Sequence, residues 1–162
     1  MDINAIASAV ATRFQAELII PPSGYSDPGV ATHLLPDAIT STPTVVVFPP
    51  EGEFSYAVQK RSGNLEFPVR FYIADTADLP RATQTMYDWA GTLIDRLQTS
   101  YDLNQSPTVT HAVISNITFG KLNYADEEYT GIEMLVRVHT EEPFAPTTIG
   151  GFTSGFSSGF DT

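Results

Sequence analysis

The chain has 162 residues, of which 8 are Lys or Arg, 19 are Asp or Glu and none is Cys, so its formal net charge is −11. This length suggests one domain, and the absence of cysteine excludes disulfides, thiolate catalysis and Cys-ligated zinc. The acidic balance argues against direct nucleic-acid binding, which needs clustered Lys and Arg. No apolar run approaches the roughly 18 residues of a membrane span. The N-terminal sequence lacks the basic residues that a secretory signal is expected to have.

The first element along the chain is an amphipathic helix over residues 2–18. Its apolar residues recur at helical spacing, Asp2 is a suitable N-cap, and Pro21-Pro22 ends it. Residues 21–43 then form a long loop rich in Pro, Gly and Ser. A loop of this length in a small domain is usually functional or ordered by a partner.

Three short strands are predicted next. Thr44–Phe48 is a continuous apolar run, residues 54–58 alternate, and residues 65–73 alternate most clearly of all, after a turn at residues 60–64. Pro68 lies inside the third strand and cannot donate a ladder hydrogen bond, so we expect this strand to be an edge or to be bulged there. An open edge is able to pair with another chain.

The main helix is predicted over residues 77–99, with Asp78 as a cap and Pro80 in the first turn. Its apolar stripe is typical of a helix that packs on a core. The stripe contains Leu79, Ala82, Met86, Ala90, Leu93 and Leu97, flanked by Trp89 and Ile94.

Two strands follow, at residues 109–122 and 132–140, and the turn between them contains the densest acidic cluster, Asp126, Glu127 and Glu128. This cluster is typical of an exposed hairpin tip. The side chains expected in the core of the first strand are Val113, Ile117 and Phe119.

This order of elements predicts an α+β fold: a mainly antiparallel sheet of four to five strands with two helices packed on one side. We expect the folded domain to comprise residues 1–142 and an extended C-terminal arm to comprise residues 143–162. No cofactor-binding, metal-binding or catalytic set is expected, because His33, His111 and His139 are isolated from one another and no phosphate-binding glycine motif is present.

The arm repeats Phe every four residues with Gly before each one, at Phe152, Phe156 and Phe160. In an extended strand these rings share one face, and together with Phe144 they are candidate assembly contacts. Burying three Phe is worth roughly 5–9 kcal/mol, whereas ordering twelve residues costs roughly 12–24 kcal/mol. Docking therefore needs main-chain hydrogen bonds to a sheet edge or many copies in one assembly; the alternative is a solvated Gly/Ser tail.

Several phrases resemble the tail terminator, or tail completion, proteins of long-tailed bacteriophages. They are Thr42-Pro43-Thr44-Val45-Val46-Val47, the strand Phe67–Ile73, Met86-Tyr87-Asp88-Trp89, and the start of the last strand, Tyr129-Thr130-Gly131-Ile132-Glu133. The resemblance covers about residues 1–142 and includes no catalytic fingerprint. The arm and the long loop are departures from the family pattern.

The resemblance implies a non-enzymatic virion protein, assembled in the host cytoplasm, that forms a homo-hexameric ring. Such a ring caps the tail tube, joins it to the neck connector and lets DNA pass without specific binding or contact with a membrane. The acidity would then repel passing phosphates, with Asp126, Glu127 and Glu128 as candidate channel-facing acids, although solubility is another reading of it. Two alternatives stay open: another neck or tail subunit, such as a connector, stopper or tube protein, and a small α+β enzyme or ligand-binding domain.

Overall fold

The computed structural model describes residues 1–57, 60–98 and 109–143. Six strands form one sheet in the order β1-β2-β4-β6-β5, with β3 also beside β4, and every pairing is antiparallel except that of β1 with β2. The α+β class is therefore confirmed, with six strands where four to five were expected. The elements are α1 (Ile3–Leu18), β1 (Val30–Thr32), β2 (Thr44–Val47), β3 (Glu51–Ala57), β4 (Lys60–Asp75), α2 (Leu79–Gln98), β5 (Val109–Tyr124) and β6 (Glu127–Pro143).

The additional strand, β1, lies within the segment that was predicted to be a loop. It runs parallel to β2, with Val30 opposite Thr44. The side-chain amide of Gln15 on α1 fixes the start of this strand, because Nε2 donates to the Gly29 carbonyl at 3.1 Å and Oε1 accepts from the Ala31 amide at 2.7 Å. A strand of three residues is too short to show a sequence period, so helix α1 rather than local pattern determines it.

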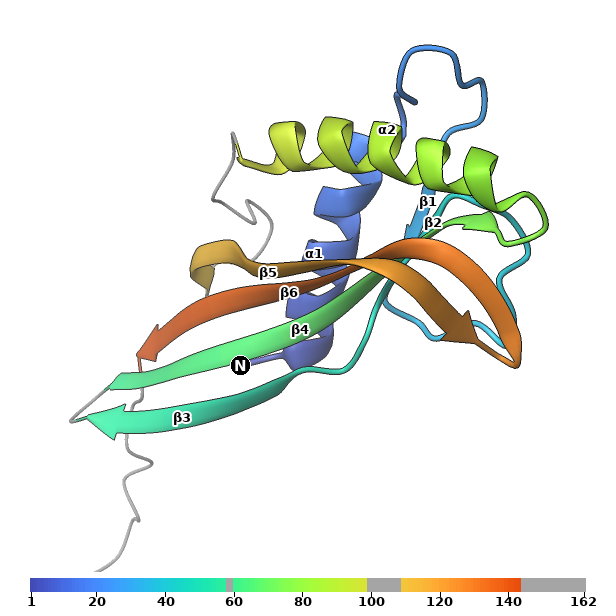
Figure 1. The fold of residues 1–162 in the computed structure, drawn as a ribbon. Helices are drawn as coiled ribbons and strands as arrows, with labels where there is room; N and C mark the ends of the chain where they lie inside the picture. Colours follow the sequence, from blue (N-terminus) through green and yellow to red (C-terminus); the bar gives the residue numbers. More distant parts are fainter. Residues whose placement is uncertain (58–59, 99–108, 144–162) are drawn as a thin grey trace, which may run out of the picture.

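Both helices pack on one face of the sheet, as predicted (Figure 1). Asp2 caps α1 by accepting from the Ala5 amide at 3.1 Å, and Asp78 accepts from the Arg81 amide at the start of α2. Trp89 packs edge-on against Phe71 of β4, with ring centroids 5.8 Å apart. The shared core contains Ile6, Val10, Phe14, Val45, Leu65, Phe67, Phe71, Trp89, Leu93, Ile132 and Met134.

Strand β4 is central, so the prediction that Pro68 marks an edge strand or a bulge is wrong. Along one side β4 pairs with β6 over nearly its whole length, and on the other it pairs first with β3 and then with β2. Pro68 lies between these two partners, and its carbonyl accepts from the Phe48 amide at 2.8 Å. The N–H and C=O groups of one strand residue point to the same side of the strand. The Pro68 nitrogen therefore faces the junction between β3 and β2, as its carbonyl does, and the missing N–H removes no hydrogen bond to β6.

The turns differ in how well they were predicted. The β5–β6 hairpin turns at Ala125 and Asp126, both with positive φ, which confirms the expected hairpin tip. The turn expected at residues 60–64 is wrong, because β4 already begins at Lys60, which pairs with Ala57. The connection at residues 58–59 lies outside the described residues.

The long segment before β2 packs against its own chain. Tyr25 donates to Asp88 of α2 at 2.9 Å, and the Tyr124 hydroxyl donates to the Pro36 carbonyl. A small second cluster lies on the sheet face opposite the helices and includes Val46, Tyr72 and Tyr129, with Ile39 packed against it. A partner molecule is therefore not needed to order this segment.

Candidate assembly surfaces

The sheet face opposite the helices carries a ladder of charged and polar pairs between β4 and β6. Arg70 bonds Glu133 at 2.6 Å, and Arg137 bonds Glu66 at 2.5 and 2.8 Å. In both pairs the residues stand directly opposite one another in the strand register. Along β4 and β6 these four charged residues alternate with buried apolar residues. Because neighbouring residues of a strand point to opposite faces, the charged side chains lie on one face of the sheet and the apolar ones on the helix-side face.

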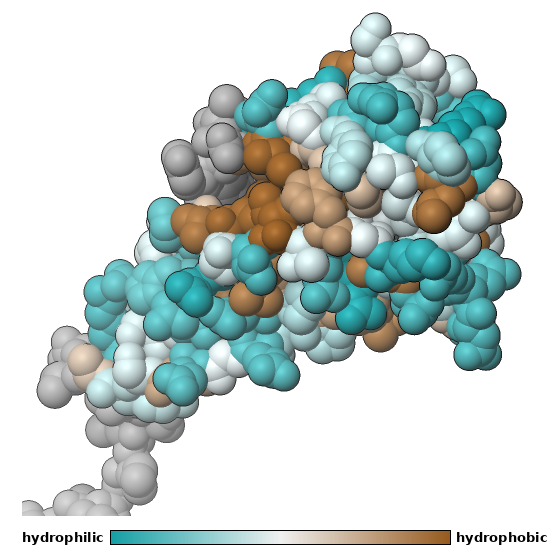
Figure 2. Space-filling model, in the orientation of Figure 1, coloured by the Kyte–Doolittle hydropathy of each residue, from teal (hydrophilic) through white to brown (hydrophobic). Residues whose placement is uncertain are grey.

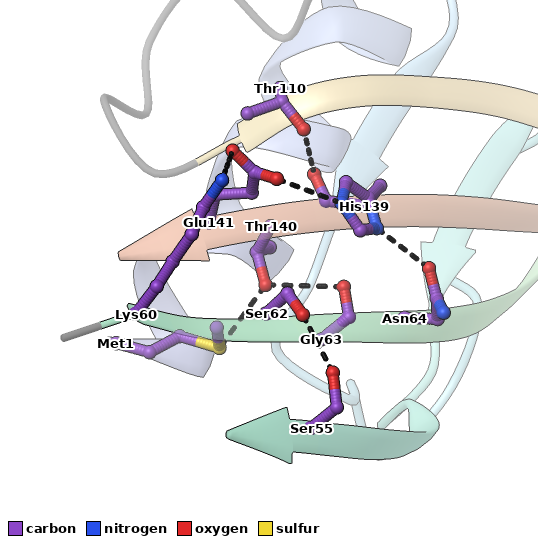
Figure 3. A network of polar contacts seen from close by, with 10 residues as sticks. All are labelled: Met1, Ser55, Lys60, Ser62, Gly63, Asn64, Thr110, His139, Thr140 and Glu141. Atoms are coloured by element: carbon purple, nitrogen blue, oxygen red, sulfur yellow. Dashed lines mark hydrogen bonds and ion pairs between the residues drawn. The ribbon is translucent and has the colours of Figure 1, made fainter. Parts of the chain in front are cut away.

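The ladder continues to the far end of these strands as a polar network (Figure 3). The Nδ1 atom of His139 lies 2.8 Å from Asn64 Oδ1, and Lys60 Nζ lies 2.7 Å from Glu141. Hydrogen bonding from Lys60, with a smaller contribution from His139, lowers the pKa of Glu141 below its ordinary value. The network connects neighbouring strands, and in the described part of the chain no group of three His, Asp or Glu side chains is placed to hold a metal ion.

A second ion cluster lies on the helix-side face at this end. The amino group of Met1 lies 2.6 Å from Glu142 Oε1, and Arg61 bonds the other carboxylate oxygen. The Glu142 side chain is only 15% exposed. Hydrogen bonds from the Met1 ammonium and from Arg61 lower its pKa. Residues 61 and 142 are far apart in sequence, so only the β4–β6 register brings them together.

This cluster predicts an acid-sensitive contribution to stability. Because the folded pKa of Glu142 is depressed, its contribution is fully present above the unfolded value of about 4.3 and is lost as pH falls through the folded pKa. Glu142→Gln should therefore be less stable than the parent in urea at pH 7, and the difference should shrink at pH 3. The exposed Glu51→Gln is the control. An equal deficit at both pH values would contradict this assignment.

Three strands of the described residues pair on one side only: the three-residue β1, and the longer strands β3 and β5. Strand β3 pairs only with β4, and all seven of its residues are exposed, including Phe54 and Tyr56. Strand β5 pairs only with β6, and none of its 16 residues is fully buried. An open edge presents unpaired N–H and C=O groups to any chain that approaches it. The prediction of an open edge at β4 is therefore wrong, because no local pattern in the sequence encodes the order of the strands in the sheet.

An apolar patch lies beside β5, on the helix side of the sheet. Phe119, predicted to be in the core, is 46% exposed, and its ring centroid lies 6.4 Å from that of Tyr87 on α2, which is 57% exposed. The prediction for Phe119 is wrong because β5 is the outermost strand and α2 covers it incompletely. Ile117 is half-buried against the core, whereas Val113 stands opposite Arg137 on the other face of the sheet, so the core prediction is wrong for Val113 as well. Leu79 at the start of α2 is exposed. Figure 2 shows apolar surface gathered between α2 and β5.

The acids predicted for the hairpin tip are exposed there. Glu128 pairs with Lys121 at 2.8 Å, and Glu127 accepts from the Tyr129 hydroxyl at 2.5 Å. Asp126 occupies the turn itself. Whether the three acids face a channel stays a prediction. Phe144, Phe152, Phe156 and Phe160 lie outside the described residues, so the docking of the arm stays a prediction as well.

The surface also has a hollow of about 680 Å³ beside β3. Its charged lining includes Glu51, Glu53 and the Glu66–Arg137 ion pair. These groups are strand-face charges with no nucleophile and base paired among them. Neither helix of the described chain has the length and apolarity to cross a membrane.

The fold of this chain is similar to that of a solved virion chain. No family model and no curated protein matches the chain. Among solved structures, a chain described as "Virion of native gene transfer agent (GTA) particle" is similar, with a TM-score of 0.54 and 14% sequence identity; the match covers 86% of this chain and 96% of that one. At this identity the likeness establishes a shared fold: the chain folds like a protein of a gene transfer agent virion over nearly the whole of that protein.

Proposed function

We propose that this protein is a structural subunit of a phage-like particle, and that it forms a hexameric ring which caps the tail tube and joins it to the neck connector. The observation that carries the proposal is the fold likeness to a gene transfer agent virion chain, which extends over 96% of that chain. The sequence phrases of residues 42–47, 67–73, 86–89 and 129–133, which resemble tail terminators, are separate support for this position in the particle.

The surfaces of the molecule suit such a role. A subunit of a ring needs two different contact surfaces, and this chain has open edges at β3 and at β5, with an apolar patch beside β5. A net charge of −11 repels phosphates, so DNA would pass such a ring without binding to it. We propose Asp126, Glu127 and Glu128 as acids at the channel, on the basis of their exposure at one hairpin tip.

Imaging of purified particles tests the proposal and distinguishes it from its nearest alternative. A small tag in the exposed Leu34–Leu35 segment should appear at the head-proximal end of the tail, and deletion of the protein should leave heads and tails unjoined. Label along the whole tube would identify a tube protein, and label inside the head opening would identify a connector. Absence of the protein from particles would reject a virion role.

The arm provides a further prediction. Strand β6 ends at Pro143, opposite Lys60, and the described core does not extend past Val138. Truncation after Pro146 should leave the urea midpoint of the folded domain nearly unchanged. It should weaken assembly, because each copy loses the anchors Phe152, Phe156 and Phe160. Sedimentation of the full-length and truncated proteins at matched concentrations measures this, and normal assembly of the truncated protein would show that the arm does not dock.

A further inference from the structure

We propose that β5 of one copy pairs with β3 of a second copy in antiparallel register, so that one sheet runs continuously through the assembly. The partner is therefore a second molecule of this chain, joined head to tail. This inference rests on the proposed ring and names the surfaces that close it. Head-to-tail contacts use two different surfaces on each copy, and they generate a ring when the rotation closes.

The strand directions support this pairing. From one open edge to the other, the long strands follow the order β3, β4, β6, β5, and each of the three neighbouring pairs is antiparallel. Strands β3 and β5 of one copy therefore run in opposite directions. When a second copy is related by rotation about an axis along the strands, its β3 arrives antiparallel to β5 of the first, so the alternation continues across the junction.

The two faces of the sheet also match across the junction. Phe54 and Tyr56 stand opposite Gly63 and Arg61, on the helix-side face, and both are exposed. On β5 the helix-side residues at the same two-residue spacing are Ile117 and Phe119, opposite Met134 and Ile132. Pairing would place aromatic rings beside apolar side chains, which stabilises neighbouring strands.

On the opposite face the two edges carry no like charges that would repel one another. Strand β3 contributes Glu51 and Glu53 and has no basic residue. Strand β5 has no acidic residue in a chain with 19 of them, and it presents Asn116 and Thr118 on this face. Edge strands that must stay unpaired usually carry charges or proline along their length. Strand β5 has a single lysine, near its end, and that lysine is paired with Glu128.

A single molecule cannot make this contact. Strands β4 and β6 lie between β3 and β5, and three strand spacings of about 4.8 Å hold the two edges roughly 14 Å apart. Figure 1 shows β3 and β5 at opposite borders of the long strands. Seven residues of β3 extend about 24 Å. A paired β3 would therefore cover a little under half of the length of β5, which has 16 residues.

In antiparallel register, Phe54 opposite Phe119 sets Tyr56 opposite Ile117, Ser55 opposite Thr118 and Ala57 opposite Asn116. Thr118 then lies diagonal to Glu53 across the junction. The variant N116E/T118E should assemble about tenfold or more weakly at each interface, because it brings new carboxylates to the acidic edge of β3 and like charges on neighbouring strands are destabilising. Adding S55K/A57K to the same chain should restore assembly, because it places a lysine directly opposite each new carboxylate. The matched control N4E/T12E makes the same two substitution types at exposed positions of α1 and should assemble like the parent. Urea unfolding should show all variants to be folded.

Sedimentation velocity and incorporation into particles measure the result. Normal assembly of N116E/T118E overturns the pairing, and so does a loss that S55K/A57K does not restore, since β3 is then not the partner. Incorporation of N116E/T118E into particles at the parental level would reject this pairing while leaving the virion role intact. A ring that forms with the predicted variant behaviour but is absent from particles would reject the virion role while leaving the pairing intact.

Discussion

Trp89→Ala is expected to lower the free energy of unfolding by about 3–5 kcal/mol, the usual cost of truncating a large buried ring. Trp89 is 2% exposed and lies where α2, β4 and the long segment before β2 meet. Its ring centroid is 5.8 Å from that of Phe71 and 6.5 Å from that of Tyr25. A cavity here would loosen the helix, the sheet and the covering segment together. Urea denaturation followed by far-ultraviolet circular dichroism measures the loss.

Tyr87→Ala is the matched control, because Tyr87 lies two residues away on the same helix and is 57% exposed. It should change the free energy of unfolding by less than about 1 kcal/mol. Equal losses in the two variants would mean that α2 is rotated about its axis relative to the arrangement described above.

Gly131→Ala is the second substitution with a large expected effect. A Cβ atom at Gly131 would lie 2.1 Å from the Phe71 carbonyl oxygen and 2.8 Å from a methyl group of Leu122. The first contact is to the backbone of β4, so the β4–β6 pairing itself must shift. We expect a loss at or above the upper end of the 1–3 kcal/mol that is usual for overpacking.

The control for this substitution is Gly91→Ala in α2. A Cβ atom there meets nothing within 4 Å, and alanine favours the helix over glycine by about 0.5–1 kcal/mol. The two substitutions add the same methyl group and should move the thermal midpoint in opposite directions. If both variants lowered the thermal midpoint, the close approach of β4 and β6 at Gly131 would not be the cause of the Gly131→Ala effect.

Local features of the sequence predicted the elements well. Both helices begin at the caps assigned to them, since Asp2 and Asp78 each accept a hydrogen bond from the first turn. Alternation located the long strand after residue 64, and the acidic cluster marked the β5–β6 hairpin tip. Each of these signals depends on residues close together in the chain, where capping and side-chain period act.

Features that depend on strand order were not predicted. Pro68 indicated an edge strand because proline has no N–H group to donate to a neighbouring strand. In the fold it lies in a central strand, at the junction between β2 and β3. Phe119 had the pattern of a core residue, and the outer position of β5 leaves it partly exposed. The Glu142 cluster and the Glu66–Arg137 pair need a register between distant strands. The resemblance to tail terminators suggested the ring. The strand edges that would join its subunits could be identified only from the order of the strands in the sheet.

The central claim is that one molecule is incomplete and that copies of it satisfy its open sheet edges. Native mass spectrometry of the full-length protein, at the concentrations where it sediments as an assembly, tests this most directly. We expect a closed species of six chains, each of 17.6 kDa. A protein that remains a single 17.6 kDa chain at every concentration, and also when mixed with tail tubes, would contradict it.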